Sequence, residues 1–108
     1  MHAIIWEYTV KPELRTAFER AYAANGPWTE LFSQSPGFVR TILLAAPNGR
    51  YVTIDFWDEA ASFDAFVQTF RSRYEAMDVE FSGMTLEENK IGRFDRVADS
   101  AFGNRPVH

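Results

Sequence analysis

The chain has 108 residues and a mass of 12.4 kDa, the size of one small domain with a single hydrophobic core. It contains no cysteine and has histidines only at positions 2 and 108, which disfavours disulfides, thiolate metal sites, cysteine nucleophiles and serine–histidine–aspartate triads. The net charge of −4 and the pI near 5.1 argue against a nucleic-acid partner, because such surfaces normally carry a basic excess. The unusual feature is the aromatic content, 16% of the chain, which must be placed in a core, an interface or a ligand site.

No apolar run approaches the ~20 residues that span a bilayer, so no membrane partner is expected. The stretch from Met1 to Glu7 lacks the basic start and the long apolar region of a signal peptide. We therefore expect a cytoplasmic protein.

The first third of the chain predicts a strand and two helices. Residues 3–10 are mostly β-branched or aromatic, which is typical of a strand. Pro12 fits the first turn of a helix, and Asn25-Gly26-Pro27 stops that helix. Between these signals runs one apolar stripe at helical spacing, made of Leu14, Ala17, Phe18, Ala21 and Tyr22. A short second helix is expected over residues 28–33.

The middle of the chain predicts a hairpin followed by a long helix. Residues 38–45 and 51–57 are predicted strands, and Pro47-Asn48-Gly49-Arg50 between them favours a tight antiparallel turn. Asp58 is a suitable N-cap for the long helix. The buried stripe of that helix consists of Phe63, Phe66, Val67, Phe70, Tyr74 and Met77.

The last third is less regular. Residues 78–88 predict a short helix or turn at one end of the sheet, and residues 90–97 predict a final strand. Residues 98–108 form a tail that is either frayed or ordered by a partner chain. The order of elements predicts a single α+β domain over residues 1–97, a ferredoxin-like four-stranded antiparallel sheet with its helices on one face.

The strands carry apolar residues on both faces, although the helices cover only one. Val52, Ile54 and Phe56 alternate with Tyr51, Thr53, Asp55 and Trp57 in the third strand. In the second strand, Phe38, Ile42 and Leu44 are expected to share a face. An uncovered face of a lone antiparallel sheet is normally polar, so we expect a homodimer through the open face. The alternative is that residues 78–88 and the tail cover this face within one chain.

The sequence resembles the antibiotic biosynthesis monooxygenase family, whose members are dimeric α+β barrels. The resemblance rests on three motifs: Pro36-Gly37-Phe38 at the start of a strand, the run from Tyr51 to Asp58, and Ala61-Ser62-Phe63 with Phe66 in the helix. It covers about residues 3–97. These motifs identify the fold better than the activity, since the fold hosts quinone-forming monooxygenases, haem-degrading enzymes, isomerases and proteins without established activity.

The resemblance makes Trp57 the first substrate-binding candidate, because a tryptophan at this strand end lines the cavity in cofactor-independent members. A flat apolar wall with one N–H donor would orient a polycyclic phenol. Trp6, Tyr8 and Trp28 are further candidates, with Trp28 as a lid over the mouth of the cavity. For each of them the alternative is a purely structural place in the core, and Tyr74 fits the core better than the cavity.

Three titratable side chains are candidates for the general base. Glu7 and Asp55 lie within strands among apolar neighbours, which would raise the pKa of either carboxyl group. The alternative is that each pairs with an arginine such as Arg40 or Arg93. His2 would serve only if the N-terminus folded inward, and a frayed, solvated histidine is the expectation.

Two kinds of cofactor chemistry are disfavoured. By family resemblance, haem degradation needs a histidine in the long helix, where this chain has Phe66-Val67-Gln68, and an asparagine in the first strand, where it has Trp6-Glu7-Tyr8. The chain also lacks a glycine-rich phosphate loop, so neither a nucleotide nor a flavin is expected, and no cofactor is predicted.

The sequence therefore predicts a cofactor-independent monooxygenase that acts on a planar aromatic or polyketide-like small molecule. The alternative is a non-catalytic, small-molecule-binding or stress-related dimer of the same fold. A third hypothesis, a structural dimer whose aromatic residues are all core, predicts no ligand-sized cavity beside Trp57.

Overall fold

The computed structural model describes residues 1–98, so the predicted tail lies outside the described residues except for Ala98. The chain order is β1 (His2–Val10), a 3-10 turn (Pro12–Leu14), α1 (Arg15–Tyr22), α2 (Pro27–Phe32), β2 (Phe38–Ala45), β3 (Arg50–Trp57), α3 (Ala60–Phe81), a second 3-10 turn (Ser82–Met84) and β4 (Thr85–Asp95).

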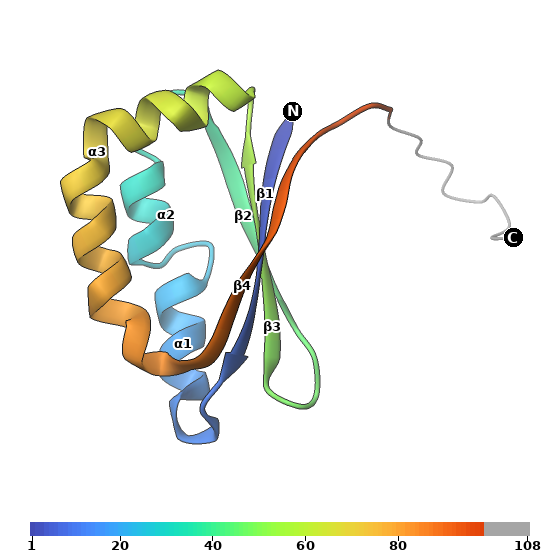
Figure 1. Ribbon diagram of the computed structural model, residues 1–108, viewed down its shortest axis with the longest axis vertical. Coiled ribbons are helices and arrows are strands. Elements are labelled where there is room, and N and C mark those ends of the chain that lie inside the picture. The colour runs from blue at the N-terminus through green and yellow to red at the C-terminus, as the bar shows by residue number, and fades with distance from the viewer. Residues whose placement is uncertain (99–108) are drawn as a thin grey trace, which may run out of the picture.

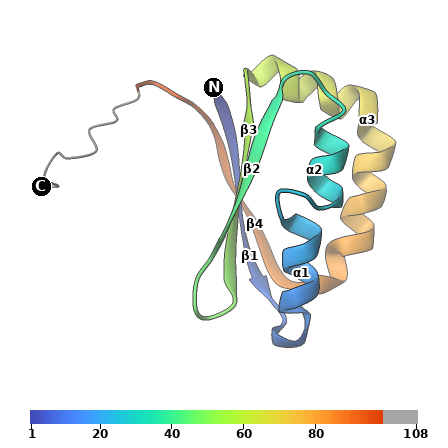
Figure 2. The same ribbon diagram turned by 180° about the vertical axis from the view of Figure 1, so that it is seen from behind.

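The described strands form one antiparallel sheet in the order β2-β3-β1-β4. All three helices lie on the same side of this sheet (Figure 1). Seen from behind, the opposite face has no helix against it within residues 1–98 (Figure 2). The predicted ferredoxin-like α+β fold is confirmed. The central strands β3 and β1 each face the helices with one side and the open surface with the other.

The hairpin between β2 and β3 follows the predicted turn chemistry. Gly49 adopts a φ of +82°, in the left-handed region that glycine tolerates best. The side chain of Asn48 accepts a hydrogen bond from the backbone N–H of Arg50 at 3.3 Å. The turn therefore fixes the register in which Leu43 faces Thr53 and Ile42 faces Ile54.

A β-bulge at the start of β2 corrects the predicted face of Phe38. The register shifts between Phe38, which pairs with Trp57, and Arg40, which pairs with Phe56. This extra residue turns Phe38 to the helix side, where its ring lies 5.3 Å from that of Trp57. Phe38 therefore does not share a face with Ile42, as strict alternation predicted.

Helix α3 begins one residue later than expected. Glu59 is its N-cap, while the carboxylate of Asp58 accepts a hydrogen bond from the Glu59 N–H at 2.7 Å. The helix is kinked at Phe70, where φ is −112° and ψ is 20°. Figure 1 shows that the first part of α3 leads away from the end of β3, and that the part after the bend runs alongside α2 and α1.

Strand β4 starts at Thr85, earlier than the predicted residue 90. Its first half is rich in charged residues, which have low strand propensity, and for this reason the sequence pattern did not predict a strand there. Pairing with β1 holds it in place, with Glu88 opposite Tyr8 and Glu87 opposite Thr9. Charged residues suit this position because β4 is an edge strand.

The core lies between the sheet and the helices and is largely aromatic. Phe18 and Tyr22 of α1 stack at 4.2 Å between ring centroids, and Tyr8 of β1 packs on both rings. The open face instead leaves Leu44 and Phe94 about half exposed. The sheet is therefore apolar on both faces but covered on only one within the described chain.

The positive φ of Gly49 predicts a specific loss of stability. Gly49→Ala should lower the free energy of unfolding by about 1–2 kcal/mol, because alanine is strained in the left-handed region and its Cβ would meet the Arg15 side chain. Gly83→Ala is the matched control, since a Cβ there meets no atom within 4 Å, and it should change stability by less than about 0.5 kcal/mol. Urea denaturation measures both, and equal effects would contradict this account of the turn.

Candidate functional site

A cleft opens between the helix-facing side of the sheet and the helices. Its empty space, including the part open to solvent, is about 470 Å³. All three helices and all four strands contribute to it. Its lining residues are Trp6, Tyr8, Tyr22, Trp28, Phe32, Thr41, Thr53, Asp55, Tyr74, Asp78 and Glu88.

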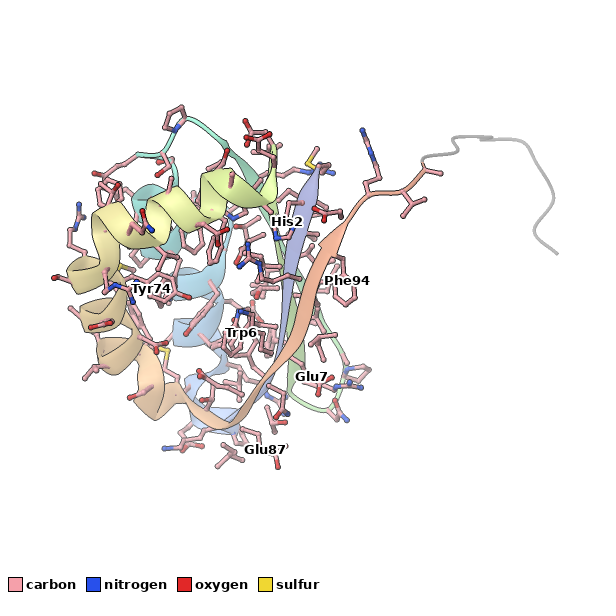
Figure 3. All side chains as sticks on the ribbon, turned by 45° about the horizontal axis from the view of Figure 1, so that its top comes forward. His2, Trp6, Glu7, Tyr74, Glu87 and Phe94 are labelled. Atoms are coloured by element: carbon pink, nitrogen blue, oxygen red, sulfur yellow. The ribbon has the colours of Figure 1, made fainter. Side chains whose placement is uncertain are left out.

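The aromatic walls of the cleft come from separate elements. Trp6 and Tyr8 project from the same face of β1 because they are two residues apart, and their rings lie nearly parallel at 6.5 Å between centroids. Trp28 of α2 packs edge-on against Tyr74 of α3 at 5.4 Å. Figure 3 shows Trp6 on the side of the sheet that faces α3, while Glu7 and Phe94 lie on the other side. The cleft therefore offers flat apolar surfaces from both the sheet and the helices.

The tyrosines of the cleft carry protonated hydroxyl groups. The hydroxyl groups of Tyr8 and Thr53 share a hydrogen bond of 3.0 Å. Burial raises the pKa of Tyr8 and of Tyr22 and raises the pKa of Tyr74 to about 12. All three phenols therefore remain protonated at neutral pH and offer O–H groups to an oxygen atom of a ligand.

Asp55 places a carboxyl group in this aromatic surrounding. Burial raises its pKa from 3.8 to about 6, and a hydrogen bond of 2.7 Å from the Thr41 hydroxyl opposes part of that rise. No arginine or lysine pairs with Asp55 among the described residues, so the alternative of an Arg40 or Arg93 partner is wrong for this residue. Asp55 thus changes protonation state close to neutral pH.

The charged groups that line the cleft are all acidic. Asp78 and Glu88 are exposed residues of α3 and β4, and no lysine, arginine or histidine belongs to the lining. Partial burial of Glu88 raises its pKa, and the nearby charge of Asp78 adds to the rise. A negatively charged ligand would therefore enter against like charge.

The structure brings together three of the four predicted substrate-binding residues. Trp6, Tyr8 and Trp28 line the cleft. Trp28 is 7% exposed, so it is a buried wall and not an external lid. Its indole N–H is buried without a hydrogen-bond partner among the described residues.

Trp57, the first candidate from the sequence, is not in the cleft. It is 0% exposed and enclosed by rings at 5.3–5.8 Å between centroids. These rings belong to Phe32, Phe38, Phe63 and Phe66. The structural alternative therefore describes Trp57, which anchors the corner between β3 and α3.

The other two candidate bases lie outside the cleft. Glu7 forms an ion pair with Arg50 on the open face, so it does pair with an arginine, although with neither of the two expected. His2 is 3% exposed and not frayed: its Nδ1 contacts Asp95 at 2.7 Å and its Nε2 accepts from Arg93 at 3.0 Å. Both ring nitrogens are engaged, so His2 joins β1 to β4 and is not available as a base.

Sequence reasoning missed several groups of the cleft. Tyr74 lies on the predicted stripe of α3, and periodicity alone does not separate a cleft residue from a core residue. Asp78 of α3 and Glu88 of β4 were not singled out from the sequence, and only the folded chain brings them into the lining of one cleft. Among residues 1–98, no group of three or more side chains is arranged to hold a metal ion, and no helix is long and apolar enough to cross a membrane.

Comparison with known proteins fits this architecture. A family model described as antibiotic biosynthesis monooxygenase matches residues 1–76. The chain belongs to the antibiotic biosynthesis monooxygenase family. A search among curated proteins finds no match.

Solved structures of monooxygenase-type proteins share the fold. A candidate family member from Nitrosomonas europaea has a TM-score of 0.69 at 19% identity, covering 91% of this chain and 100% of that one. SnoaB, a cofactor-independent oxygenase from Streptomyces nogalater, has a TM-score of 0.64 at 20% identity, covering 91% and 94%. A candidate family member from Deinococcus radiodurans has a TM-score of 0.72 at 8% identity, covering 94% and 98%. At these identities the similarity concerns the fold alone.

The raised pKa of Asp55 predicts how stability depends on pH. Between pH 4 and 6 the unfolded chain releases this proton more readily than the folded chain, so stability should fall as pH rises, by about 2–3 kcal/mol in all for this group. Asp55→Asn should remove this fall and make the protein more stable at pH 7. Asp64→Asn, the same change at an exposed position of α3, should still show the decrease in stability as pH rises. Urea titrations across pH measure it, and an unchanged profile in Asp55→Asn would contradict the assignment.

Proposed function

We propose that the protein is a cofactor-independent monooxygenase that oxidises a planar, phenol- or anthrone-like small molecule in the cleft between β1 and α3. The observation that carries the proposal is the meeting of flat aromatic walls, protonated tyrosines and a titratable carboxyl group in one cleft. Family membership supports the reaction type. The similarity in fold to SnoaB, a cofactor-independent oxygenase, supports a reaction that needs no cofactor.

The walls would orient the substrate by stacking and by hydrogen bonds. Trp6 and Tyr8 provide the surface on the sheet side, and Trp28 and Tyr74 provide the surface on the helix side. An aromatic ring held between such faces gains dispersion and apolar burial. Tyrosine hydroxyl groups would then hold the substrate oxygen and favour its negatively charged form.

The proposed reaction uses molecular oxygen as its only oxidant. Loss of a proton from an anthrone-like substrate leaves an electron pair on carbon, and this carbanion passes electrons to oxygen and forms a C–O bond. The resulting peroxide anion takes up the proton lost in the first step and becomes a hydroperoxide. The hydroperoxide loses water as its O–O bond breaks and the remaining hydrogen leaves carbon as a proton, which joins the departing hydroxide. One anthrone and one O₂ thus give one quinone and one water. The protein's part is to position the substrate and to stabilise its anion.

A non-catalytic module that holds an aromatic metabolite is the second candidate. The partly open form of the cleft favours it, because chemistry on a carbanion benefits from exclusion of water. The two functions differ in turnover and not in the site of binding.

Oxygen uptake and tryptophan fluorescence together test the proposal. The purified protein should consume oxygen above the buffer rate with a panel of anthrones and dihydroxynaphthalenes. Trp6→Phe and Trp28→Phe should each weaken binding or turnover about 3–30-fold, because the larger indole face is lost at the wall of the cleft. Trp57→Phe is the matched control and should leave ligand affinity within about twofold, since Trp57 lies outside the cleft.

Three outcomes distinguish the candidates. Quenching without oxygen uptake would favour the binding module. Neither quenching nor uptake across the panel would reject both. A larger effect of Trp57→Phe than of Trp6→Phe would place the ligand elsewhere.

We further propose that the open face of the sheet binds a second copy of this chain. The face is apolar at its centre, where Ile5, Ile42 and Ile54 lie side by side. Charges of both signs, Glu7 and Arg50, lie beside these residues. A two-fold arrangement places such a surface against itself, so each positive group can meet a negative one.

Light scattering tests this dimer. The protein should have about twice the 12.4 kDa mass of one chain. Ile54→Lys should shift it toward the monomer, because burying an unpaired ammonium group at the centre of the interface is unfavourable. Val79→Lys, a change at a 76% exposed position of α3, should remain dimeric. A wild-type mass near 12.4 kDa would overturn the proposal.

A further inference from the structure

We propose that Asp55 is the catalytic base of this cleft, and that it takes the proton of an uncharged, flat aromatic substrate whose acidic C–H or O–H group faces β3. The inference rests on the proposed function and deepens it by assigning the proton acceptor and the charge of the substrate. The comparisons identify a family and a fold and assign no residue a role.

Geometry makes one oxygen of Asp55 available to a ligand. Thr41 donates to Oδ1 at 2.7 Å and fixes the carboxyl group. Within residues 1–98, Oδ2 has no hydrogen-bond partner and is not completely buried. Asp55 lines the cleft whose aromatic walls would hold a ring.

Among the titratable residues that line the cleft, Asp55 is the one suited to act as the base. Those that face the cleft are Tyr8 from β1, Tyr22 from α1, Tyr74 and Asp78 from α3, and Glu88 from β4. The tyrosines have raised pKa values and remain donors. Asp78 and Glu88 are exposed residues that line the cleft. Asp55 alone combines a pKa of about 6 with a place beside Trp6 and Tyr8.

The same neighbours restrict the charge of the substrate. Asp78 and Glu88 repel an anion at the opening, and no cation of the lining compensates. A substrate that already carried a carboxylate would also lower the acidity of its own reacting group beside Asp55. The cleft therefore suits a neutral substrate that becomes an anion only after its proton has moved to Asp55.

The proton transfer balances within the proposed reaction. The substrate C–H or O–H bond breaks, its proton binds Oδ2 of Asp55, and its electron pair stays on the substrate as the carbanion or phenolate that reduces O₂. The C–O bond formed with O₂ gives a peroxide anion, and Asp55 returns the proton to it to make the hydroperoxide. When the hydroperoxide loses water, the proton that leaves carbon joins the departing hydroxide. Asp55 is then ready for the next substrate, and O₂ is the only oxidant required.

Oxygen uptake with anthrone between pH 4.5 and 8 tests the assignment after subtraction of the buffer rate. In the wild type, kcat/KM should rise about tenfold per pH unit below pH 6 and level off above it. Asp55→Asn should lower kcat/KM at least about 100-fold and abolish the rise. Asp55→Glu should restore a pH-dependent rise, and Asp64→Asn, the matched control, should behave as the wild type.

A binding measurement separates this inference from the oxygenase itself. The affinity for 2-naphthol, followed by tryptophan quenching, should increase about fivefold from pH 5 to 7 in the wild type, because a carboxylate accepts a stronger hydrogen bond than a carboxylic acid. It should be constant in Asp55→Asn. If the affinity for 2-naphthol rises with pH but no substrate of the panel causes oxygen uptake, Asp55 contacts the ligand and the oxygenase function is rejected. Uptake whose rate and pH profile survive in Asp55→Asn would overturn Asp55 as the base and leave the oxygenase standing.

Discussion

The packing of aromatic rings between one face of the sheet and three helices is the constraint on which the rest of the molecule depends. Phe18 and Tyr22 stack at 4.2 Å, and Trp57 is sealed by phenylalanine rings. Rings are rigid and large, so a few of them fix the distance between the two layers. The cleft lies between the same two layers.

The interior has two chemically different ends. Around Trp57 the side chains are apolar and enclosed, which ties the end of β3 to the start of α3. Around Tyr8 the wall includes hydroxyl groups and the carboxyl group of Asp55, and the space opens to solvent. Burying Asp55 raises its pKa, which makes ionisation unfavourable for stability near neutral pH. A group that destabilises the fold yet lines an aromatic cleft is typical of a functional site.

Much of the fold follows from local sequence signals. Asn48-Gly49 specifies the hairpin, and the stripe of α3 specifies its buried side. The start of β4 was missed because Glu87 and Glu88 have low strand propensity, and pairing with β1 overrides it. The face of Phe38 was missed because a bulge breaks the alternation, and no residue pattern announces that bulge. Of the four candidate residues, Trp6, Tyr8 and Trp28 line the same cleft, whereas Trp57 does not join them.

The sequence by itself determined the fold class, the one-sided placement of helices and the pool of aromatic residues from which a site is made. These properties follow from periodicity and turn chemistry, which are local. Only the tertiary structure decided that Trp57 is core. It also decided that Asp55 lines the cleft with Trp6 and Tyr8, bonded to Thr41 and without an ion pair among residues 1–98. Burial and pairing depend on residues that are distant in the chain, and a side chain's pKa depends on what surrounds it. Periodicity contains neither kind of information.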